Sequence, residues 1–233
     1  MMDKDDIVRI ARERGITNNE FIEKDYYIDL VLYEISKLNL KVVFKGGTAL
    51  YKIYGIPRFS EDLDFAVLED FDIGVIMGMA DRQGFGCEHK KYGTSLFVKL
   101  SFNGFLTGKN RLRIDFSRLH RPISYSLKSY ISPYIDVSPF MVNVLDRKEI
   151  LAEKIHAIYH RNSARDMYDL FYLLRIEKPD TEIILKKVPE YDPDRLIGKL
   201  KKYEKGWDRE IRVFAMEYVD FAAALGYIEK NIR

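Results

Sequence analysis

The sequence contains one short stretch whose residue types could do chemistry together: KGGTALYKIYGIPRFSEDLDFAV, residues 45–67. Asp62 and Asp64 flank a single leucine in this stretch, and on a β-strand residues two apart point to the same side of the sheet. Two adjacent carboxylates repel each other unless a cation lies between them. Oxygen ligands suit Mg²⁺, which takes one or two carboxylates and completes its shell with water and substrate phosphates. The aspartate pair therefore predicts a metal site, with an ordinary surface pair as the alternative.

Gly46, Gly47 and Thr48 precede this pair and lie between a predicted strand, 41–45, and a short predicted helix, 48–54. Residues without side chains let a ligand approach the main chain closely. The first N–H groups of a helix carry a partial positive charge that favours phosphate, and a threonine hydroxyl adds a donor. A tight turn is the simpler interpretation of a Gly-Gly-Thr that stands alone. Followed by the aspartate pair, it predicts a phosphate-binding turn beside a metal site.

A third carboxylate, Asp115, stands within residues 112–116, where it is flanked by apolar residues on a predicted strand. A lone charge there would be costly to bury, so it requires a partner. If this strand lies beside that of Asp62 and Asp64, the three carboxylates can hold two Mg²⁺ ions, or Mn²⁺ in their place. One ion would activate an attacking hydroxyl and the other would stabilise a leaving pyrophosphate. A salt bridge from Asp115 to a neighbouring arginine is the alternative.

The rest of the sequence has to position these residues, and its hydrophobic pattern predicts an α+β fold. Two helices open the chain, and segments with strand-like alternation are predicted at 41–45, 63–68, 95–102, 111–116 and 139–145. From Asp146 onward the pattern is helical, and it ends in a single long helix at 207–229. We therefore predict a mixed sheet core with flanking helices over residues 1–137 and a helical C-terminal domain over residues 138–233.

Composition narrows the class of protein. The 233 residues are 47% apolar and 32% charged, as in globular rather than disordered proteins. One cysteine, no leader-like start and no apolar run long enough to span a membrane predict a cytoplasmic protein without a membrane partner. The net charge of +2 argues against a strongly basic nucleic-acid-binding protein. A local basic surface, or else a solvated strand edge, is predicted from Lys109, Arg111, Arg113, Arg118, Arg121 and Lys128.

The Gly-Gly-Thr, the aspartate pair and the later strand aspartate together resemble the pattern of the DNA polymerase β-type nucleotidyltransferase superfamily. Four segments are more closely similar to the AbiEii/AbiGii-type toxin family and occur in the order typical of it. They are FIEKDYYIDLVL, FKGGTALYKIYG, RFSEDLDF and LAEKIHAIYHRNSARDMYDLFYLL. Because these segments span residues 21 to 174, the resemblance covers most of the chain.

This resemblance implies a function and its partners. It implies a nucleotidyltransferase-type sheet core, an NTP as donor, Mg²⁺ as cofactor and release of pyrophosphate. The acceptor that it implies is RNA, for which we expect a tRNA 3′ end. It also implies that the protein is the toxin of a type IV toxin–antitoxin or abortive-infection system, opposed by an antitoxin that is encoded nearby.

The resemblance also assigns residues. Catalytic roles carry over onto Asp62 and Asp64, onto Lys154 in Glu-Lys-Ile-His and onto Asp169 in Arg-Asp-Met-Tyr-Asp-Leu. A lysine is a natural point charge for nucleotide phosphates, and Asp169 could hold Lys154 in place or contact the nucleotide. The alternative is a solvated helix face, on which such charge pairs are worth only ~0.3–0.5 kcal/mol. Substrate contacts are expected from Arg58, Ser60 and Arg165.

Other functions stay open on the residues alone. They are nucleotidyl transfer to a protein or to a small molecule such as an antibiotic, binding without catalysis, and metal-dependent nuclease activity. His156 and His160 are four residues apart but lack the glutamate of a His-Glu-x-x-His zinc site. Lys24 and Asp25 are expected to form structural ion pairs that dock the helix on which they lie.

Overall fold

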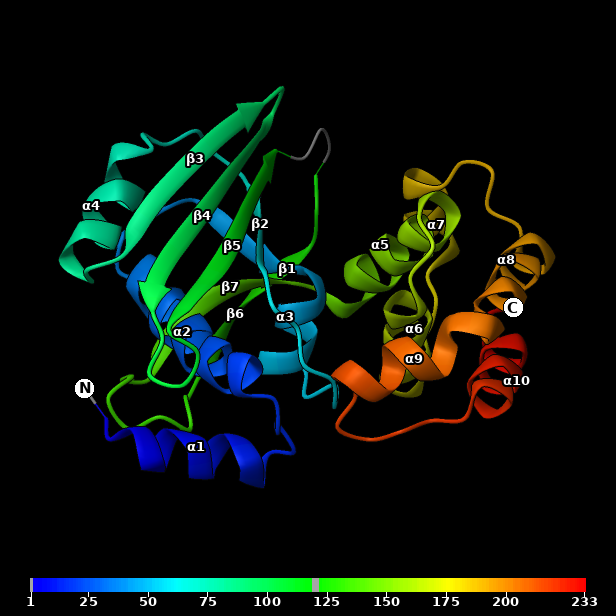
Figure 1. Ribbon diagram of the computed structural model, residues 1–233. Helices are drawn as coiled ribbons and strands as arrows, with labels where there is room; N and C mark the ends of the chain where they lie inside the picture. The colour runs from blue at the N-terminus through cyan, green and yellow to red at the C-terminus, as the bar shows by residue number, and fades with distance from the viewer. Residues whose placement is uncertain (1, 119–121) are drawn as a thin grey trace. The chain divides into compact units, whose positions relative to one another are not determined.

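The protein divides into two compact units in a computed structural model that describes residues 2–118 and 122–233. The first unit comprises Met1–Tyr54 and Phe59–Val144, and the second comprises Gly55–Arg58 and Leu145–Arg233. The first contains a sheet with helices and the second is helical (Figure 1). The domain boundary predicted after residue 137 falls before the strand Phe140–Leu145, which is the last strand along the chain. The two units of the structure divide after Val144.

The first unit is built on a seven-stranded mixed sheet with the order β3-β4-β5-β2-β1-β7-β6. β2 pairs in parallel with β5 and antiparallel with β1, while β3, β4 and β5 form an antiparallel meander. The strands are β1 Val42–Lys45, β2 Leu63–Val67, β3 Gly86–Tyr92, β4 Ser95–Asn103, β5 Lys109–Arg118, β6 Tyr125–Tyr130 and β7 Phe140–Leu145. The predicted α+β class is confirmed, and the two strands that carry the aspartates are neighbours.

Four helices accompany this sheet: α1 Lys4–Glu13, α2 Asn19–Ser36, α3 Gly46–Lys52 and α4 Gly74–Arg82. α2 packs against α1, α4 and β5. It begins at an N-cap formed by Asn18, whose side chain accepts hydrogen bonds from the main-chain N–H groups of Glu20 and Phe21. Burial on several sides of α2 leaves it no fully exposed face, so its charged residues need partners inside the unit.

The second unit contains α5 Arg147–His160, α6 Ala164–Ile176, α7 Thr181–Lys187, α8 Pro193–Leu200, a 3₁₀ turn Lys201–Tyr203, α9 Glu204–Phe214 and α10 Phe221–Asn231. The single long helix predicted at 207–229 is wrong, because the chain leaves the helix at Ala215. There Ala215 forms a β-bridge with Arg58, and the N–H of Met216 donates to the carbonyl of Pro57 at 2.9 Å. The Gly55–Arg58 segment is thereby held within the second unit.

None of the helices in the described part of the chain combines the length and the apolar character needed to cross a membrane.

Candidate active site

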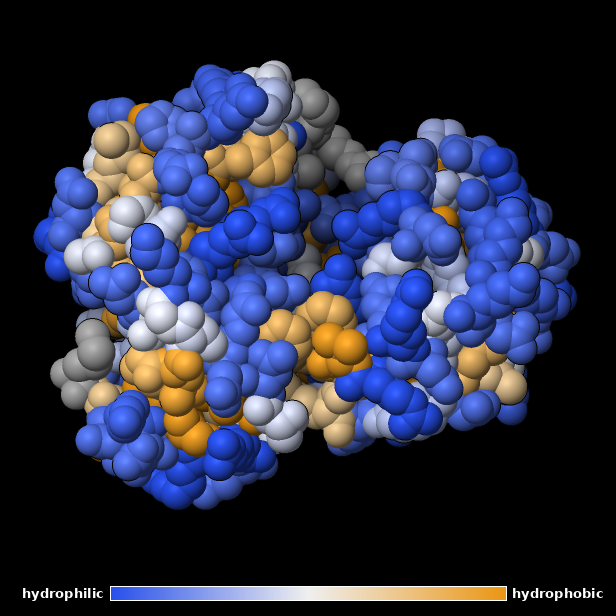
Figure 2. All heavy atoms as spheres, viewed as in Figure 1, coloured by the Kyte–Doolittle hydropathy of each residue, from blue (hydrophilic) through white to orange (hydrophobic). Residues whose placement is uncertain are grey.

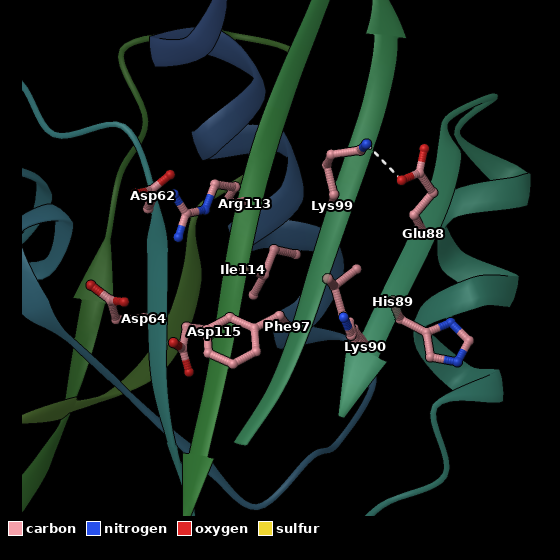
Figure 3. A pocket seen from close by; sticks show the side chains of 11 residues that line it. Asp62, Asp64, Glu88, His89, Lys90, Phe97, Lys99, Arg113, Ile114 and Asp115 are labelled. Carbon is pink, nitrogen blue, oxygen red and sulfur yellow. Dashed lines mark ion pairs between the residues drawn. The ribbon is translucent and has the colours of Figure 1, made fainter. Parts of the chain in front are cut away.

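Three aspartates lie together where β2 and β5 run side by side. Asp64 is paired in register with Asp115 on β5, and Asp62 comes directly before β2. Because cross-strand partners and residues two apart along a strand share one side of a sheet, the three side chains lie on the same side. They line one cavity of about 320 Å³ (Figure 3). The predicted approach of the two aspartate-bearing strands is confirmed.

Gly46 brings the main chain of the β1–α3 turn against the Asp64 carboxylate. Its φ of +75° lies in the left-handed region that favours glycine, and a Cβ at this residue would overlap the Asp64 side chain. Gly47 follows as a buried residue of α3. Gly46 and the carboxylate are therefore in direct contact, which is the arrangement that a phosphate-binding turn beside a metal site requires.

Thr48 and Lys24 fix the chain on either side of Asp62. Thr48 is fully buried, and its hydroxyl donates a hydrogen bond to the main-chain carbonyl of Asp62. Lys24 Nζ lies 2.7 Å from the carboxylate of Glu61, the residue before Asp62. Ser60 is half-buried nearby. In the structure Thr48 positions Asp62, and direct contacts from Thr48 or Ser60 to a phosphate stay predictions.

Burial and mutual repulsion act on the aspartates and raise the pKa values of Asp62 and Asp115. Burial raises the pKa of Asp115, and the carboxylate of Asp64 raises it further. Burial also raises the pKa of Asp62; Arg113 counteracts this shift, and Asp64 adds to it. Asp115 Oδ1 is buried and has no hydrogen-bond partner among the residues that the structure describes. The salt bridge considered as an alternative for Asp115 is absent from the same residues.

A divalent cation fits these carboxylates. It would offset their mutual repulsion and supply the partner that Asp115 Oδ1 lacks, and their oxygens are the ligands that Mg²⁺ prefers. Within residues 2–118 and 122–233, no three side chains of His, Cys, Asp or Glu are grouped so that together they could hold a metal ion. Water and substrate phosphates would therefore have to complete the coordination of an ion here.

The second unit holds a separate cluster of charges around Lys154 and Asp169. Lys154 Nζ lies 2.7 Å from Asp169 and 3.1 Å from Asp166. Arg58 donates two hydrogen bonds of 2.7 Å to Asp169, and Arg161 donates two of 2.7 Å to Asp166. All of these residues except Arg161 are buried. The expected pairing of Lys154 with Asp169 is present, and a solvated helix face is excluded.

The cluster compensates its own charges. Burial alone would raise the pKa of Asp169, but Arg58 and Lys154 outweigh it and hold that pKa below its usual range. In the same way, Lys154 and Arg161 outweigh burial and lower the pKa of Asp166. Both acids are therefore held as carboxylates by fixed cations.

Two of the expected substrate contacts are engaged in the second unit. Arg58 is committed to its two hydrogen bonds with Asp169. Arg165 Nε lies 3.1 Å from Glu210, and its guanidinium lies 4.5 Å from the centre of the Phe214 ring. Contacts of Arg58 and Arg165 to a nucleotide stay predictions.

A buried polar network that includes two acids of α2 was not predicted from the sequence. Lys52 Nζ lies 2.7 Å from Asp25 and 2.6 Å from Asp29, and the hydroxyls of Tyr134 and Tyr130 donate to these two acids. The available signal was the spacing of Asp25 and Asp29, one helical turn apart among apolar residues. Asp25 does form structural ion pairs, as expected.

Comparisons with known proteins agree with the fold. No curated protein matches the sequence. The structure resembles MenT4, a nucleotidyltransferase toxin from Mycobacterium tuberculosis H37Rv, with a TM-score of 0.65 and 21% identity over 97% of this chain and 88% of that one. It also resembles JHP933 from Helicobacter pylori, with a TM-score of 0.60 and 17% identity over 92% of this chain and 91% of that one. Likenesses at such identities concern the fold.

The sequence itself gives the assignment. The model of the family described as "Nucleotidyl transferase AbiEii toxin, Type IV TA system" matches residues 30–227. This match includes the glycines, all three aspartates and the cluster around Lys154. The chain therefore belongs to the AbiEii family of nucleotidyltransferase toxins of type IV toxin–antitoxin systems.

Proposed function

We propose that this protein moves a nucleoside monophosphate from an NTP onto the 3′ end of an RNA, with tRNA as the expected acceptor, in a Mg²⁺-dependent reaction in the cytoplasm. Membership of the family already supplies the class of enzyme, a nucleotide substrate and an antitoxin partner. The observation that carries the proposal is the contact of Asp64 with the Gly46 turn on one side and its pairing with Asp115 on the other.

The residues of the first unit have distinct roles in this reaction. Asp62, Asp64 and Asp115 are the residues that would hold divalent ions, which supply charge neutralisation at the transferred phosphate when bound. Gly46 brings the main chain of the turn against the Asp64 carboxylate, so an ion held by Asp64 would lie next to a triphosphate bound along the turn. Thr48 fixes the main chain of Asp62, and such positioning matters because a misplacement of about 1 Å can cost ~10²-fold in rate.

The reaction itself needs little covalent chemistry from the protein. The 3′ hydroxyl oxygen of the acceptor attacks the α-phosphorus of the NTP. The bond from that phosphorus to the bridging oxygen breaks, pyrophosphate leaves, and the hydroxyl proton passes to solvent. Catalysis of such a transfer consists mostly of positioning and charge neutralisation.

Lys154 and Asp169 are proposed to act as a pair. Lys154 would contact the phosphates of the nucleotide, and Asp169 would position Lys154, because it lies 2.7 Å from Nζ and is itself held by Arg58. Lys154→Ala should reduce the transfer rate sharply. A rate close to that of the wild type would remove Lys154 from the catalytic residues.

The test is transfer of label from α-³²P-NTP in the presence of Mg²⁺. Wild-type protein is incubated with total RNA, with cell protein and with an aminoglycoside, beside Asp62→Asn and a control, Asp81→Asn, whose side chain is exposed on α4. We expect label on RNA with the wild type and the control, and none with Asp62→Asn. Label on protein or on the aminoglycoside would overturn the RNA acceptor, shortened RNA would indicate a nuclease, and full activity of Asp62→Asn would remove the proposed site. Sequencing of RNA 3′ ends then identifies the nucleotide and the acceptor.

A further inference from the structure

A row of basic side chains continues from the aspartates along the same side of β5. Lys109, Arg111 and Arg113, here called the basic ladder, alternate with buried residues and share the side of Asp115. At about 3.4 Å per residue, the ladder extends roughly 20 Å from Asp115 to Lys109. All three side chains are exposed, and none of them forms an ion pair within the described part of the chain. Unpaired exposed bases in a row form a surface suited to a polyanion.

The strands next to β5 extend this surface. Lys99 on β4 is in register with Arg113, and Lys90 on β3 is in register with Phe97. Besides the aspartates, Glu88 and Glu20 line this surface; Glu88 is paired with Lys99 at 2.6 Å and Glu20 with Lys24 at 2.7 Å. Two hollows, of about 320 Å³ and 750 Å³, follow one another over the three strands and share Lys99 in their linings. Hydrophilic side chains cover most of this area, and an apolar patch lies toward the β3–β4 hairpin (Figure 2).

The other bases predicted from this part of the sequence lie elsewhere. Arg118 points to the opposite side of β5 and pairs with Asp70 at 2.9 Å. Lys128 lies on β6, at the opposite edge of the sheet. Arg121 lies outside the described residues. The strand alternation thus divides a basic stretch of sequence and leaves the ladder, rather than the whole stretch, beside the aspartates.

An aromatic side chain stands where the ladder meets the aspartates. Phe97 is in register with Asp115, is half-buried and lines the same cavity (Figure 3). The Tyr92 ring lies edge-on to it, with the ring centres 5.9 Å apart. Aromatic side chains beside a positively charged groove are the usual means of holding single-stranded nucleic acid, because any base can stack on them.

We propose that the basic ladder and Phe97 bind the single-stranded 3′ end of the acceptor RNA, with phosphates on the ladder and a terminal base on Phe97. This inference rests on the proposed function. The turn at Gly46 occupies the β1 side of Asp64, so a triphosphate bound there leaves the β5 side for the second substrate. The acceptor then reaches the aspartates along β5, and the unpaired positive charge of the ladder complements its backbone.

The test compares two double variants that remove the same charges. Lys109→Ala/Arg111→Ala removes the far part of the ladder and leaves Arg113, which lies close to the aspartates. Arg82→Ala/Lys128→Ala removes one arginine and one lysine that are exposed elsewhere in the same unit. The probes are a 5′-fluorescent RNA hairpin with a four-nucleotide 3′ overhang and the same hairpin with a blunt end, and the readout is fluorescence anisotropy.

The wild type should bind the overhang more tightly than the blunt hairpin. The ladder variant should lose about tenfold or more in affinity for the overhang, and its slope of log K against log salt should fall by roughly 1.4, which is ~0.7 for each lost phosphate contact. The control should stay within about twofold of the wild type. In the label-transfer assay the ladder variant should show a higher KM for RNA with an unchanged KM for NTP.

Other outcomes overturn the inference. Equal losses of RNA affinity in both double variants would show that net charge alone determines binding. Equal affinity of the wild type for both hairpins would exclude a site for single-stranded RNA. If the wild type labels RNA while the ladder variant keeps its KM for RNA, the ladder proposal fails and the proposed function stands. If the wild type labels no RNA at all, the proposed function fails, and this result needs no variant.

A second pair of variants tests the stacking residue and covers a failure of the ladder variant to fold. Phe97→Leu keeps apolar volume but loses the ring, and Phe97→Tyr keeps the ring. Since base stacking is worth about 5- to 150-fold in affinity for each base, Phe97→Leu should weaken binding of the overhang RNA by a factor in that range, and Phe97→Tyr should not. Similar affinities for both variants would remove Phe97 from the site.

Discussion

The two charged clusters of this protein differ in how their charges are balanced. Around Lys154, each acid is held by at least two cations, and burial and ion pairing make the cluster self-sufficient. Around Asp64 and Asp115, the acids lie side by side, and one buried oxygen has no hydrogen-bond partner among the described residues. Breaking a buried ion pair destabilises a fold, whereas a buried carboxylate oxygen without a partner, such as Oδ1 of Asp115, is maintained at a cost to it.

This difference indicates that the aspartate site, unlike the cluster around Lys154, needs a bound cation. A group of acids that raises its own pKa values by burial and repulsion is a candidate functional site, although structural networks can perturb pKa values as well. In the Lys154 cluster, the pKa values of the acids are lowered, as in a structural network. The catalytic contribution of the helical unit is therefore proposed to come from a lysine that is already fixed in place. Replacement of an aspartate by asparagine should therefore affect mainly catalysis at the aspartate site and mainly stability in the cluster around Lys154.

The largest effect is expected from Asp64→Asn on catalysis. Loss of this carboxylate would remove a ligand of the divalent ion that neutralises charge at the transferred phosphate, and we expect transfer of label from NTP to fall by about 10³-fold or more. The fold should persist, as judged by circular dichroism and by a thermal unfolding midpoint close to that of the wild type. A substituted protein that keeps its activity would place the reaction elsewhere.

The corresponding change in the helical unit, Asp169→Asn, should act on stability. It leaves the buried guanidinium of Arg58 without its carboxylate, and removal of one partner of a buried ion pair costs about 3–5 kcal/mol. Denaturant unfolding measures this loss. In the double variant Arg58→Met/Asp169→Asn the orphaned cation is gone, and part of the stability should return, by ~0.5–3 kcal/mol of coupling. Strict additivity of the two single variants would contradict the assignment of this pair.

The aspartate site could be predicted from sequence to a large extent, because its geometry is mostly local. Alternation places Asp62 and Asp64 on one side of a strand without any knowledge of the sheet. The strands β2 and β5 are neighbours because of the order of strands in the sheet. The sequence indicated this only because a buried Asp115 would need a partner. The register that sets Asp64 against Asp115 comes from the structure.

The charged cluster of the helical unit could be predicted only in part. Helical periodicity brings Arg165, Asp166 and Asp169 onto one helix, but it cannot show that Arg58, 111 residues away in the chain, completes the cluster. The Gly55–Arg58 segment joins the helical unit through main-chain contacts at Ala215, and no local pattern encodes that excursion. For the same reason the break between α9 and α10 was missed.

A smaller effect, on the free energy of unfolding, is expected from Asp115→Asn at the aspartate site. In protein without metal, the change removes a charge whose burial and neighbours are unfavourable, so the free energy of unfolding should stay the same or rise by about 1 kcal/mol. The measurement is urea unfolding in the presence of a chelator. A loss of stability comparable to that expected for Asp169→Asn would mean that both clusters are structural, and the distinction drawn between them would be lost.

The smallest effect is expected in how the stability changes caused by Asp169→Asn and Asp115→Asn depend on pH. The pKa of Asp169 is lower in the folded protein, so its stabilising contribution is complete above the unfolded pKa of about 3.9 and disappears as the pH falls below that value. The pKa of Asp115 is raised in the folded protein, so its penalty is complete above that raised pKa, decreases as the pH falls below it, and is gone once the pH is below the unfolded pKa of about 3.9. In metal-free protein the effect of Asp115→Asn should therefore vanish at a higher pH than that of Asp169→Asn. Unfolding free energies measured for both variants between pH 7 and about pH 3.5 check the order, and the reverse order would contradict the assignment of an unfavourable buried charge to Asp115.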